Sequence, residues 1–169
     1  MLRNAAWKSV VVIVWLVSGG GAFGAGGKYN ILGLTTNMPQ AEAEQIIAKA
    51  NWACEVESHD SVIIEKCQTG KTDYTEVKIH YATILDKHPI SYILAFGTPS
   101  VHDVSEKIGR QPDCRDDGYI WELDDSTMLK LIGDDHLKSQ ALVQLNSALP
   151  TIRRSYAGTL KQCKARKTN

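Results

Sequence analysis

Residues 54–67 read CEVESHDSVIIEKC, and this stretch decides how the first part of the chain folds. After Cys54, small or apolar residues alternate with glutamates, which is the period of a β-strand. Pairing Cys54 with Cys67 in an antiparallel hairpin puts its centre between Asp60 and Ser61, and opposed residues of such strands are close enough for a disulfide. Closing a loop of about 14 residues contributes about 3 kcal/mol on the chain-entropy model. The stretch therefore predicts a stapled hairpin.

The tip of this hairpin places Ser58, His59 and Asp60 side by side. A hydrolase triad needs an aspartate that orients the imidazole while the imidazole reaches the serine, and its members normally come from separate segments. Neighbouring strand residues point to opposite faces instead. We expect these three residues to form a solvated turn with no catalytic role.

The first 24 residues have the build of a secretory signal. Arg3 and Lys8 precede the apolar run Val10–Val17, and Ala22 and Gly24 are small residues suited to a cleavage site. The apolar core is about half the ~20 residues that span a bilayer. We therefore expect residues 1–24 to be a signal peptide and the protein to be periplasmic or secreted in a bacterium, with no stable membrane span after cleavage. An uncleaved N-terminal anchor is the alternative.

Charge argues against a general nucleic-acid binder. Without Arg3 and Lys8 the chain has 17 basic and 19 acidic residues, a net charge of −2. The charges are unevenly placed: residues 103–135 contain ten acids and four bases, and residues 150–169 contain six bases and no acid. The basic tail either docks on the acidic segment of its own fold or meets an external polyanion.

The chain has four cysteines, Cys54, Cys67, Cys114 and Cys163. An even count in an exported chain indicates two disulfides, for which three connectivities are open. The absence of C-x-x-C excludes thioredoxin-type chemistry. The hairpin argument favours Cys54–Cys67, which leaves Cys114–Cys163 as the second expected pair.

Periodicity predicts an α+β fold in which a helix is followed by an antiparallel β-meander, with a C-terminal helix. A 3.6-residue period marks helices at 39–51, 100–108 and from Pro150 onward, whereas alternation or β-rich composition marks the segments between them as strands. We expect Asn37 to cap the first helix, and Ser100 with Asp103 to form a capping box on the second. Residues 136–149 fit either a strand, QALVQLNS, or a helix.

The pattern also suggests a duplication. Pro39 opens the first helix with Cys54 fifteen residues later, and Pro99 and Cys114 repeat this spacing 60 residues on. We therefore divide the mature chain into a first helix-plus-sheet unit, 25–98, and a second unit with the C-terminal helix, 99–169. Chance placement of helix-starting prolines is the alternative.

An enzyme or a metal-binding protein remains the rival class. The acidic loop around Asp113 (DCRDDG) and the cluster at 134–136 lack the spacing of a calcium loop, and turn-forming aspartates explain them equally well. His80 and His88 match no zinc signature. We expect no cofactor, no metal and no catalytic residue. A hydrolase or metal site using His80 or His88 with the acidic loops is the alternative.

Aromatic and basic residues suggest where a partner could bind. Tyr119 and Trp121 alternate on the strand GYIWEL and either pack beneath a helix or form a protein-binding face. Arg153 and Arg154 lie off the apolar stripe of the C-terminal helix. These four residues are the possible binding surface that we predict, with another protein as partner.

Residues 33–47, GLTTNMPQAEAEQII, carry a resemblance to known families. A helix rich in Ala-Glu dipeptides, introduced by such a turn and packed on an antiparallel sheet, resembles the small outer-membrane-assembly lipoproteins of the BamE/SmpA type. It is also similar to the tandem helix-plus-sheet repeat of the β-lactamase inhibitor protein. The lipid-anchored cysteine of the first family has no counterpart here. The resemblance implies a non-catalytic α+β protein that works by binding.

Overall fold

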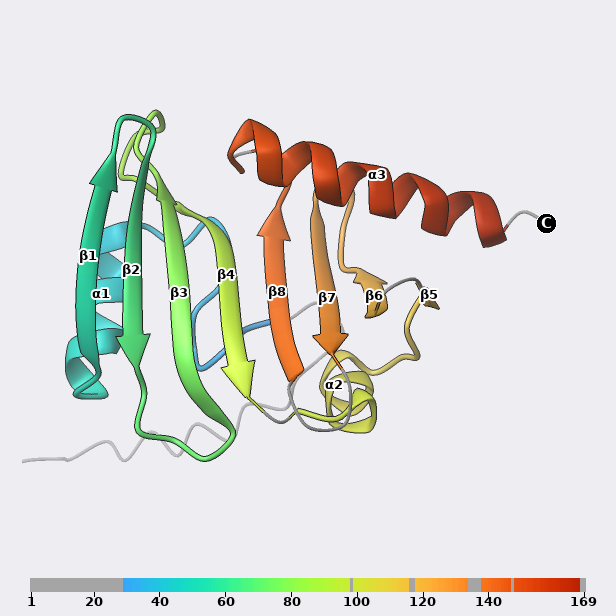
Figure 1. Ribbon diagram of the computed structural model, residues 1–169, viewed down its shortest axis with the longest axis horizontal. Coiled ribbons are helices and arrows are strands. Elements are labelled where there is room, and N and C mark those ends of the chain that lie inside the picture. Colours follow the sequence, from blue (N-terminus) through green and yellow to red (C-terminus); the bar gives the residue numbers. More distant parts are fainter. Residues whose placement is uncertain (1–28, 98, 116–117, 134–137, 147, 168–169) are drawn as a thin grey trace, which may run out of the picture.

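The computed structural model describes residues 29–97, 99–115, 118–133, 138–146 and 148–167. The described residues form three helices and one antiparallel sheet of eight strands (Figure 1). In chain order these elements are α1 (Gln40–Lys49), β1 (Ala53–His59), β2 (Val62–Gln68), β3 (Tyr74–Ala82), β4 (Ile90–Gly97), α2 (Val101–Ile108), β5 (Cys114–Arg115), β6 (Gly118–Glu122), β7 (Thr127–Gly133), β8 (Lys138–Gln144) and α3 (Pro150–Lys167). The predicted α+β class is confirmed.

The sheet is made of two meanders that meet in its middle. Its strand order is β1-β2-β3-β4-β8-β7-β6-β5, so β4 pairs with β8, and β1–β4 and β5–β8 each form four neighbouring strands. Between Tyr92↔Val143 and Gly97↔Lys138 this central pairing continues without a register shift. The two meanders thus form a single continuous sheet. The strand alternative for residues 136–149 is correct for Lys138–Gln144, whereas residues 134–137 and 147 lie outside the described part.

The first hairpin has the predicted register. Cys54 pairs with Cys67 and His59 with Val62, so Asp60 forms half of a two-residue turn. A disulfide joins Cys54 to Cys67, with 4.0 Å between their Cα atoms. The hairpin prediction is confirmed because strand alternation and the cysteine positions fix the same register.

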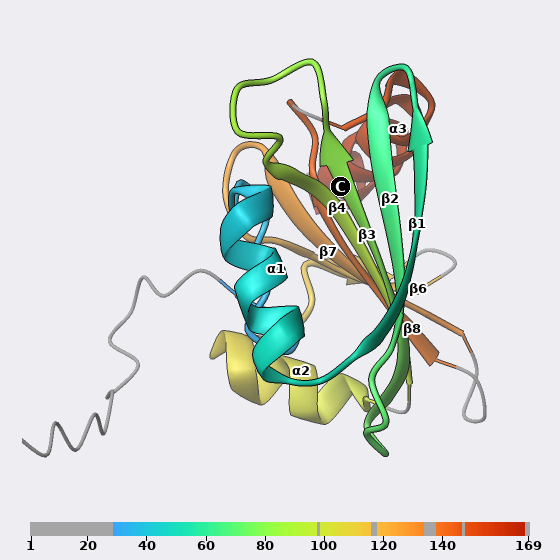
Figure 2. The same ribbon diagram turned by 90° about the vertical axis from the view of Figure 1, so that its left-hand side faces the viewer.

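The helices lie on opposite faces of the sheet. Figure 2 shows α1 and α2 on one side and α3 on the other. Beneath α1 and α2, Ile79, Ile93 and Leu129 are among the buried residues of the larger core cluster. Beneath α3, Leu160 packs in a second cluster with residues of the opposite sheet face, and Cys163 is bonded to Cys114. The second expected disulfide is therefore present.

The two N-terminal helices begin differently. Ser100 and Asp103 form the predicted capping box of α2, and Gly109 ends that helix in the left-handed region with φ of 80°. The expectation that Asn37 caps α1 is wrong: Pro39 is the N-cap, and no side-chain hydrogen bond caps the helix. Asn37 instead has φ of 66°, and its N–H donates to the Ile90 carbonyl at 2.8 Å. It therefore ties the chain before α1 to β4.

A polar cluster is buried under the α1–α2 layer. The hydroxyls of Tyr29 and Tyr74 each donate to Gln140 Oε1 at 2.9 Å, and Gln140 is fully buried in β8. Burial raises the pKa of Tyr74 to about 12. Because buried polar groups are costly without partners, this cluster joins β3, β8 and the segment before α1 through shared hydrogen bonds.

Among the described residues, none of the helices combines the length and apolar character that crossing a membrane requires.

Candidate functional site: the open half of the sheet

Helices cover the two faces of the sheet unequally. The face under α1 and α2 is packed into the main core, whereas α3 crosses the opposite face over β8, β7 and β6 (Figure 1). On that opposite face no described helix lies over β1–β3. We call this surface, with the adjoining side chains of β4, the open face. The strand register places on it Ala53, Glu55, Glu57, His59, Val62, Ile64, Lys66, Gln68, Glu76, Lys78 and His80, with Leu94 and Phe96 of β4 adjoining. Tyr92, next to His80, is buried in the cluster under α3.

Alternation along β3 places these side chains. Val77, Ile79 and Tyr81 point into the core and are buried, so Lys78 and His80 point to the open face, where they are half-buried. The register then aligns Lys66, Lys78 and Leu94 across three strands. The sequence shows the same alternation, but it does not show which strands pair with β3 to complete the surface.

Four of the five charged side chains of the open face form ion pairs within it. Lys66 forms an ion pair with Glu57, and Lys78 Nζ lies 3.3 Å from a Glu76 carboxylate oxygen. Lys78 Nζ also lies 5.0 Å from the centre of the Phe96 ring, which is a cation–π distance. Such exposed pairs contribute little to stability, so their main effect is to arrange both signs of charge around an aromatic ring.

A hollow of about 500 Å³ opens on this face near its β1 side. It is lined by Ala53, Cys54, Glu55, Lys66, Gln68, Glu76 and Lys78. Most of these side chains are polar or charged, whereas small-molecule sites are mainly apolar with a few polar groups. The lining is therefore better suited to polar and charged groups of a partner than to a small apolar ligand.

His80 is the titratable group with the clearest perturbation on the open face. Burial, with smaller contributions from Lys78 and Lys66, lowers its pKa to about 4. Its ring meets the Tyr92 ring edge to face at 5.0 Å, and its Nδ1 is buried without a hydrogen-bond partner among the described residues. The ring is therefore neutral at pH 7. A general base works best with a pKa near the operating pH, so this environment does not favour that role.

The predicted aromatic surface needs correction at Trp121. Its side chain is 0% exposed in the core under α2, and its Nε1–H donates to the Arg110 carbonyl at 3.3 Å. Tyr119 is half-buried on the same face, with the Arg115 guanidinium 5.1 Å from its ring centre. Of the two alternatives, packing beneath a helix is the one that holds for Trp121, because β6 lies within the sheet and both of its faces are covered.

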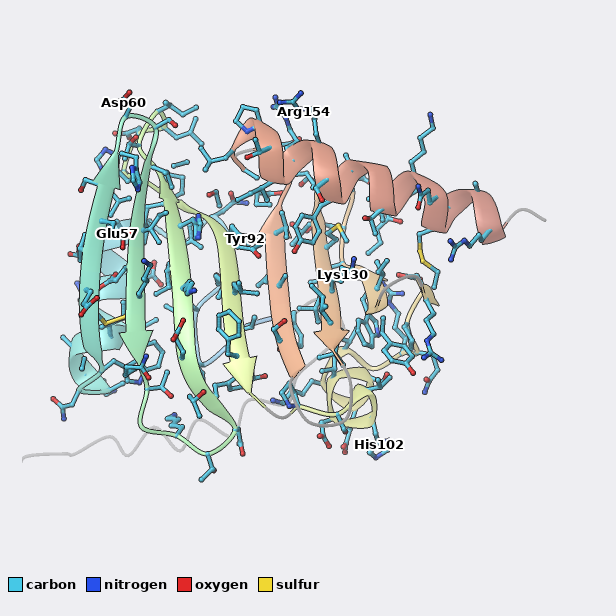
Figure 3. All side chains as sticks on the ribbon, viewed as in Figure 1. Glu57, Asp60, Tyr92, His102, Lys130 and Arg154 are labelled. Carbon is cyan, nitrogen blue, oxygen red and sulfur yellow. A yellow bond between two sulfur atoms is a disulfide. The ribbon has the colours of Figure 1, made fainter. Side chains whose placement is uncertain are left out.

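The two predicted arginines lie on the exposed side of α3. Arg153 and Arg154 are both exposed, and Arg154 Nε–H donates to the Pro150 carbonyl at 3.3 Å. In Figure 3, Arg154 stands at the outer side of α3, away from the strands. Further along α3, Lys164 lies 2.6 Å from a Glu122 carboxylate oxygen, which raises the pKa of Lys164. Part of the basic helix therefore does dock on the acidic segment.

Asp113 and His88, two residues of the rival hypothesis, have hydrogen-bond partners within the fold. Asp113 accepts hydrogen bonds from Arg110 at 2.6 Å and from the Glu122 N–H at 2.7 Å. His88 Nδ1 lies 3.2 Å from Gln40 Oε1. The predicted acids at 116–117 and the cluster at 134–136 lie outside the described residues. Asp113 and His88 thus each act in local structure.

One group of potential metal ligands occurs among the described residues. Cys54, Glu65 and Cys67 have ligand atoms within 4.8 Å of one another. The two sulfurs are joined in a disulfide, however, and only the thiolate form of cysteine binds metal. Glu65 is buried and accepts a hydrogen bond from the Tyr81 hydroxyl at 2.9 Å. The group therefore belongs to the core in the oxidised protein.

In comparisons with known proteins, the chain matches no family model, no curated protein and no solved structure. Function must therefore be argued from the site itself.

Proposed function

We propose that this protein is an exported, non-catalytic binding protein that contacts another protein through the open face. The observation that supports the proposal is a continuous eight-stranded sheet with one face that no described helix covers over β1–β3. Paired charges lie on that face, and the half-buried Leu94 and Phe96 of β4 border it, with Leu94 also packing against the cluster beneath α3. A surface on rigid strands needs little ordering when a partner binds, which favours affinity.

The composition of the open face supports a protein partner. Aromatic residues are enriched in protein–protein contact regions, and polar side chains surround them at the rim. Three acids (Glu55, Glu57 and Glu76) and two bases (Lys66 and Lys78) leave the face without the excess positive charge that a nucleic acid requires.

Export is supported by the disulfides. Two disulfides are present, and such bonds persist in oxidising compartments outside the cytosol. The predicted signal peptide, residues 1–24, lies outside the described residues. The disulfides make the protein compatible with an oxidising extracellular compartment. We propose, more specifically, that it is periplasmic or secreted.

Site-specific photo-crosslinking in the producing cells tests the open face. A photoreactive amino acid replaces Gln68, which is exposed on this face, and in a matched control it replaces Glu106, which is exposed on α2. We expect one discrete protein adduct from position 68 and none of the same mass from position 106. The charge reversals Lys66→Glu and Lys78→Glu should reduce that adduct, because they reverse the positive charges of the face.

Identical adducts at both positions, or an adduct at position 68 that both reversals leave unchanged, would contradict the proposal. So would finding no adduct at position 68 under conditions where the variant is folded and exported. Folding is checked by far-ultraviolet circular dichroism and by the absence of free thiols.

A further inference from the structure

The two edges of the sheet are built differently. The edge strand β5 has two residues, and it is held to α3 by Cys114–Cys163 and by a hydrogen bond from Arg166 Nη1 to the Arg115 carbonyl at 2.7 Å. The edge strand β1 has seven residues and, among the described parts of the chain, pairs only with β2. In natural proteins the edge strands of a sheet are usually short or covered. Among the described residues, the β5 edge is short and held against α3, whereas the β1 edge is long and uncovered.

The register shows which backbone groups of β1 point away from the sheet. His59 and Val62 flank the two-residue turn, so they form a hydrogen-bonded pair, and pairs alternate from there along an antiparallel ladder. Cys54 and Cys67 then form a non-hydrogen-bonded pair, which agrees with the short 4.0 Å between their Cα atoms. The N–H and C=O groups of Cys54, Val56 and Ser58 are therefore directed outward.

Side-chain packing explains little of what holds β1 in place. Of its seven residues only Cys54 is half-buried, the others are exposed, and Val56 is 61% exposed. A strand that buries so little apolar surface gains little from the hydrophobic effect. The ladder to β2 and the Cys54–Cys67 disulfide therefore keep β1 extended. The result is an ordered strand with free backbone groups on its outer side.

The charges of β1 select against pairing with a second copy of the chain. When Val56 lies opposite Val56 of another copy in an antiparallel arrangement, Glu55 faces Glu57. Placing Val56 opposite Cys54 or Ser58 instead brings Glu55 opposite Glu55 or Glu57 opposite Glu57. Like charges that are directly opposed destabilise a strand pair. A partner with basic residues at these positions would replace that repulsion with attraction.

We propose that β1 binds an extended segment of a partner protein that carries basic residues at alternate positions. The segment adds a strand to the sheet through the backbone groups of Cys54, Val56 and Ser58, as in other strand-addition complexes. Its basic side chains lie beside Glu55 and Glu57. This site adds the outer backbone groups of β1 to the open face, to which Glu55 and Glu57 belong. It goes beyond the proposed function because the backbone groups can be tested apart from the rest of that face.

Amide hydrogen exchange with a defined peptide tests the proposal. The probe is a seven-residue peptide of alternating lysine and valine with blocked ends, added to the oxidised chain, and exchange is followed residue by residue by NMR. We expect the peptide to slow exchange at the amides of Cys54, Val56 and Ser58. Exchange at the amides of Glu55 and Glu57 should change little, because these N–H groups already donate hydrogen bonds to carbonyls of β2. The matched control peptide carries glutamate in place of lysine and should slow none of these amides.

A proline variant separates strand addition from general charge attraction. Val56→Pro removes an outward N–H but no bond to β2, and proline is tolerated at such edge positions. We expect it to weaken binding of the lysine peptide by about tenfold or more, which corresponds to one or two lost hydrogen bonds. Val56→Thr keeps the N–H and should bind as the unaltered protein does.

Several results would overturn the proposal. These are equal binding of the lysine and glutamate peptides, unchanged binding by Val56→Pro, or protection that fails to alternate along β1. Protection of the Val56 amide in the free protein at concentrations where it is dimeric would identify a second copy as the occupant instead. If Val56→Pro does not fold, the double variant Glu55→Lys with Glu57→Lys is used in its place. The proposal requires this variant to bind the glutamate peptide more tightly than the lysine peptide.

Discussion

Acidification should destabilise this protein through His80. In the unfolded chain this ring has a pKa of 6.5, whereas burial beside Lys78 and Lys66 lowers the folded value to about 4. Because the unfolded state binds the proton more tightly, stability is lost as the pH falls from about 6.5 to about 4. From about pH 7.5 to about pH 5 the two pKa values give a loss of about 2 kcal/mol from this group, and below pH ~4 it approaches about 3 kcal/mol.

The measurement is urea unfolding, followed by tryptophan fluorescence at both pH values, on the unaltered protein and on His80→Gln. Glutamine cannot be protonated, so the unaltered protein should lose about 2 kcal/mol more than the variant between the two conditions. The other titrating groups are common to both proteins and cancel in the difference. Equal losses in the two proteins, or an NMR titration that places the His80 pKa near 6.5, would refute the reasoning.

The remaining predictions concern one buried acid and two glycines. Burial raises the pKa of Glu65, so the unaltered protein loses stability as the pH rises. The free energy of unfolding of Glu65→Gln, measured by urea unfolding relative to the unaltered protein, should therefore be more favourable at about pH 8 than at about pH 5. An equal gain at both pH values would contradict this. Gly97→Ala should lower the free energy of unfolding by about 2–3 kcal/mol, since its Cβ would sit 1.9 Å from the Asp73 carbonyl oxygen. Gly158→Ala, which meets no atom within 4 Å, should raise that free energy by about 0.5–1 kcal/mol, and thermal melts of both variants check the opposite signs.

Local signals were sufficient for much of the fold. The hairpin register followed from Cys54, Cys67 and strand alternation, and the α2 cap followed from the spacing of Ser100 and Asp103. These features depend on residues close together in the chain, where side-chain direction and hydrogen bonding are fixed by spacing alone. The same reasoning failed at Asn37, because its N–H bonds to Ile90 in β4, a partner that no local pattern indicates.

The candidate site depended more on distant contacts. Alternation shows that His80 points away from the core, but its burial comes from neighbours on other strands, including Tyr92. Alternation along its strand makes Trp121 a candidate for a binding surface, yet the α2 layer covers it. Which half of the second sheet face the described helices cover depends on the path of α3. Sequence periodicity gives an element's apolar side but not the element that it packs against.

The pairing of β4 with β8 has a consequence for how the molecule assembles. Inside each meander, strands pair with neighbours in the chain. Tyr92 of β4 instead pairs with Val143 of β8, and α2 and three other strands lie between them in the sequence. Closing a longer loop costs more chain entropy, and non-local contacts slow folding. The meanders should therefore form early and join last. Until they join, the inner edges of β4 and β8 are unpaired, so dilute conditions should favour refolding over aggregation.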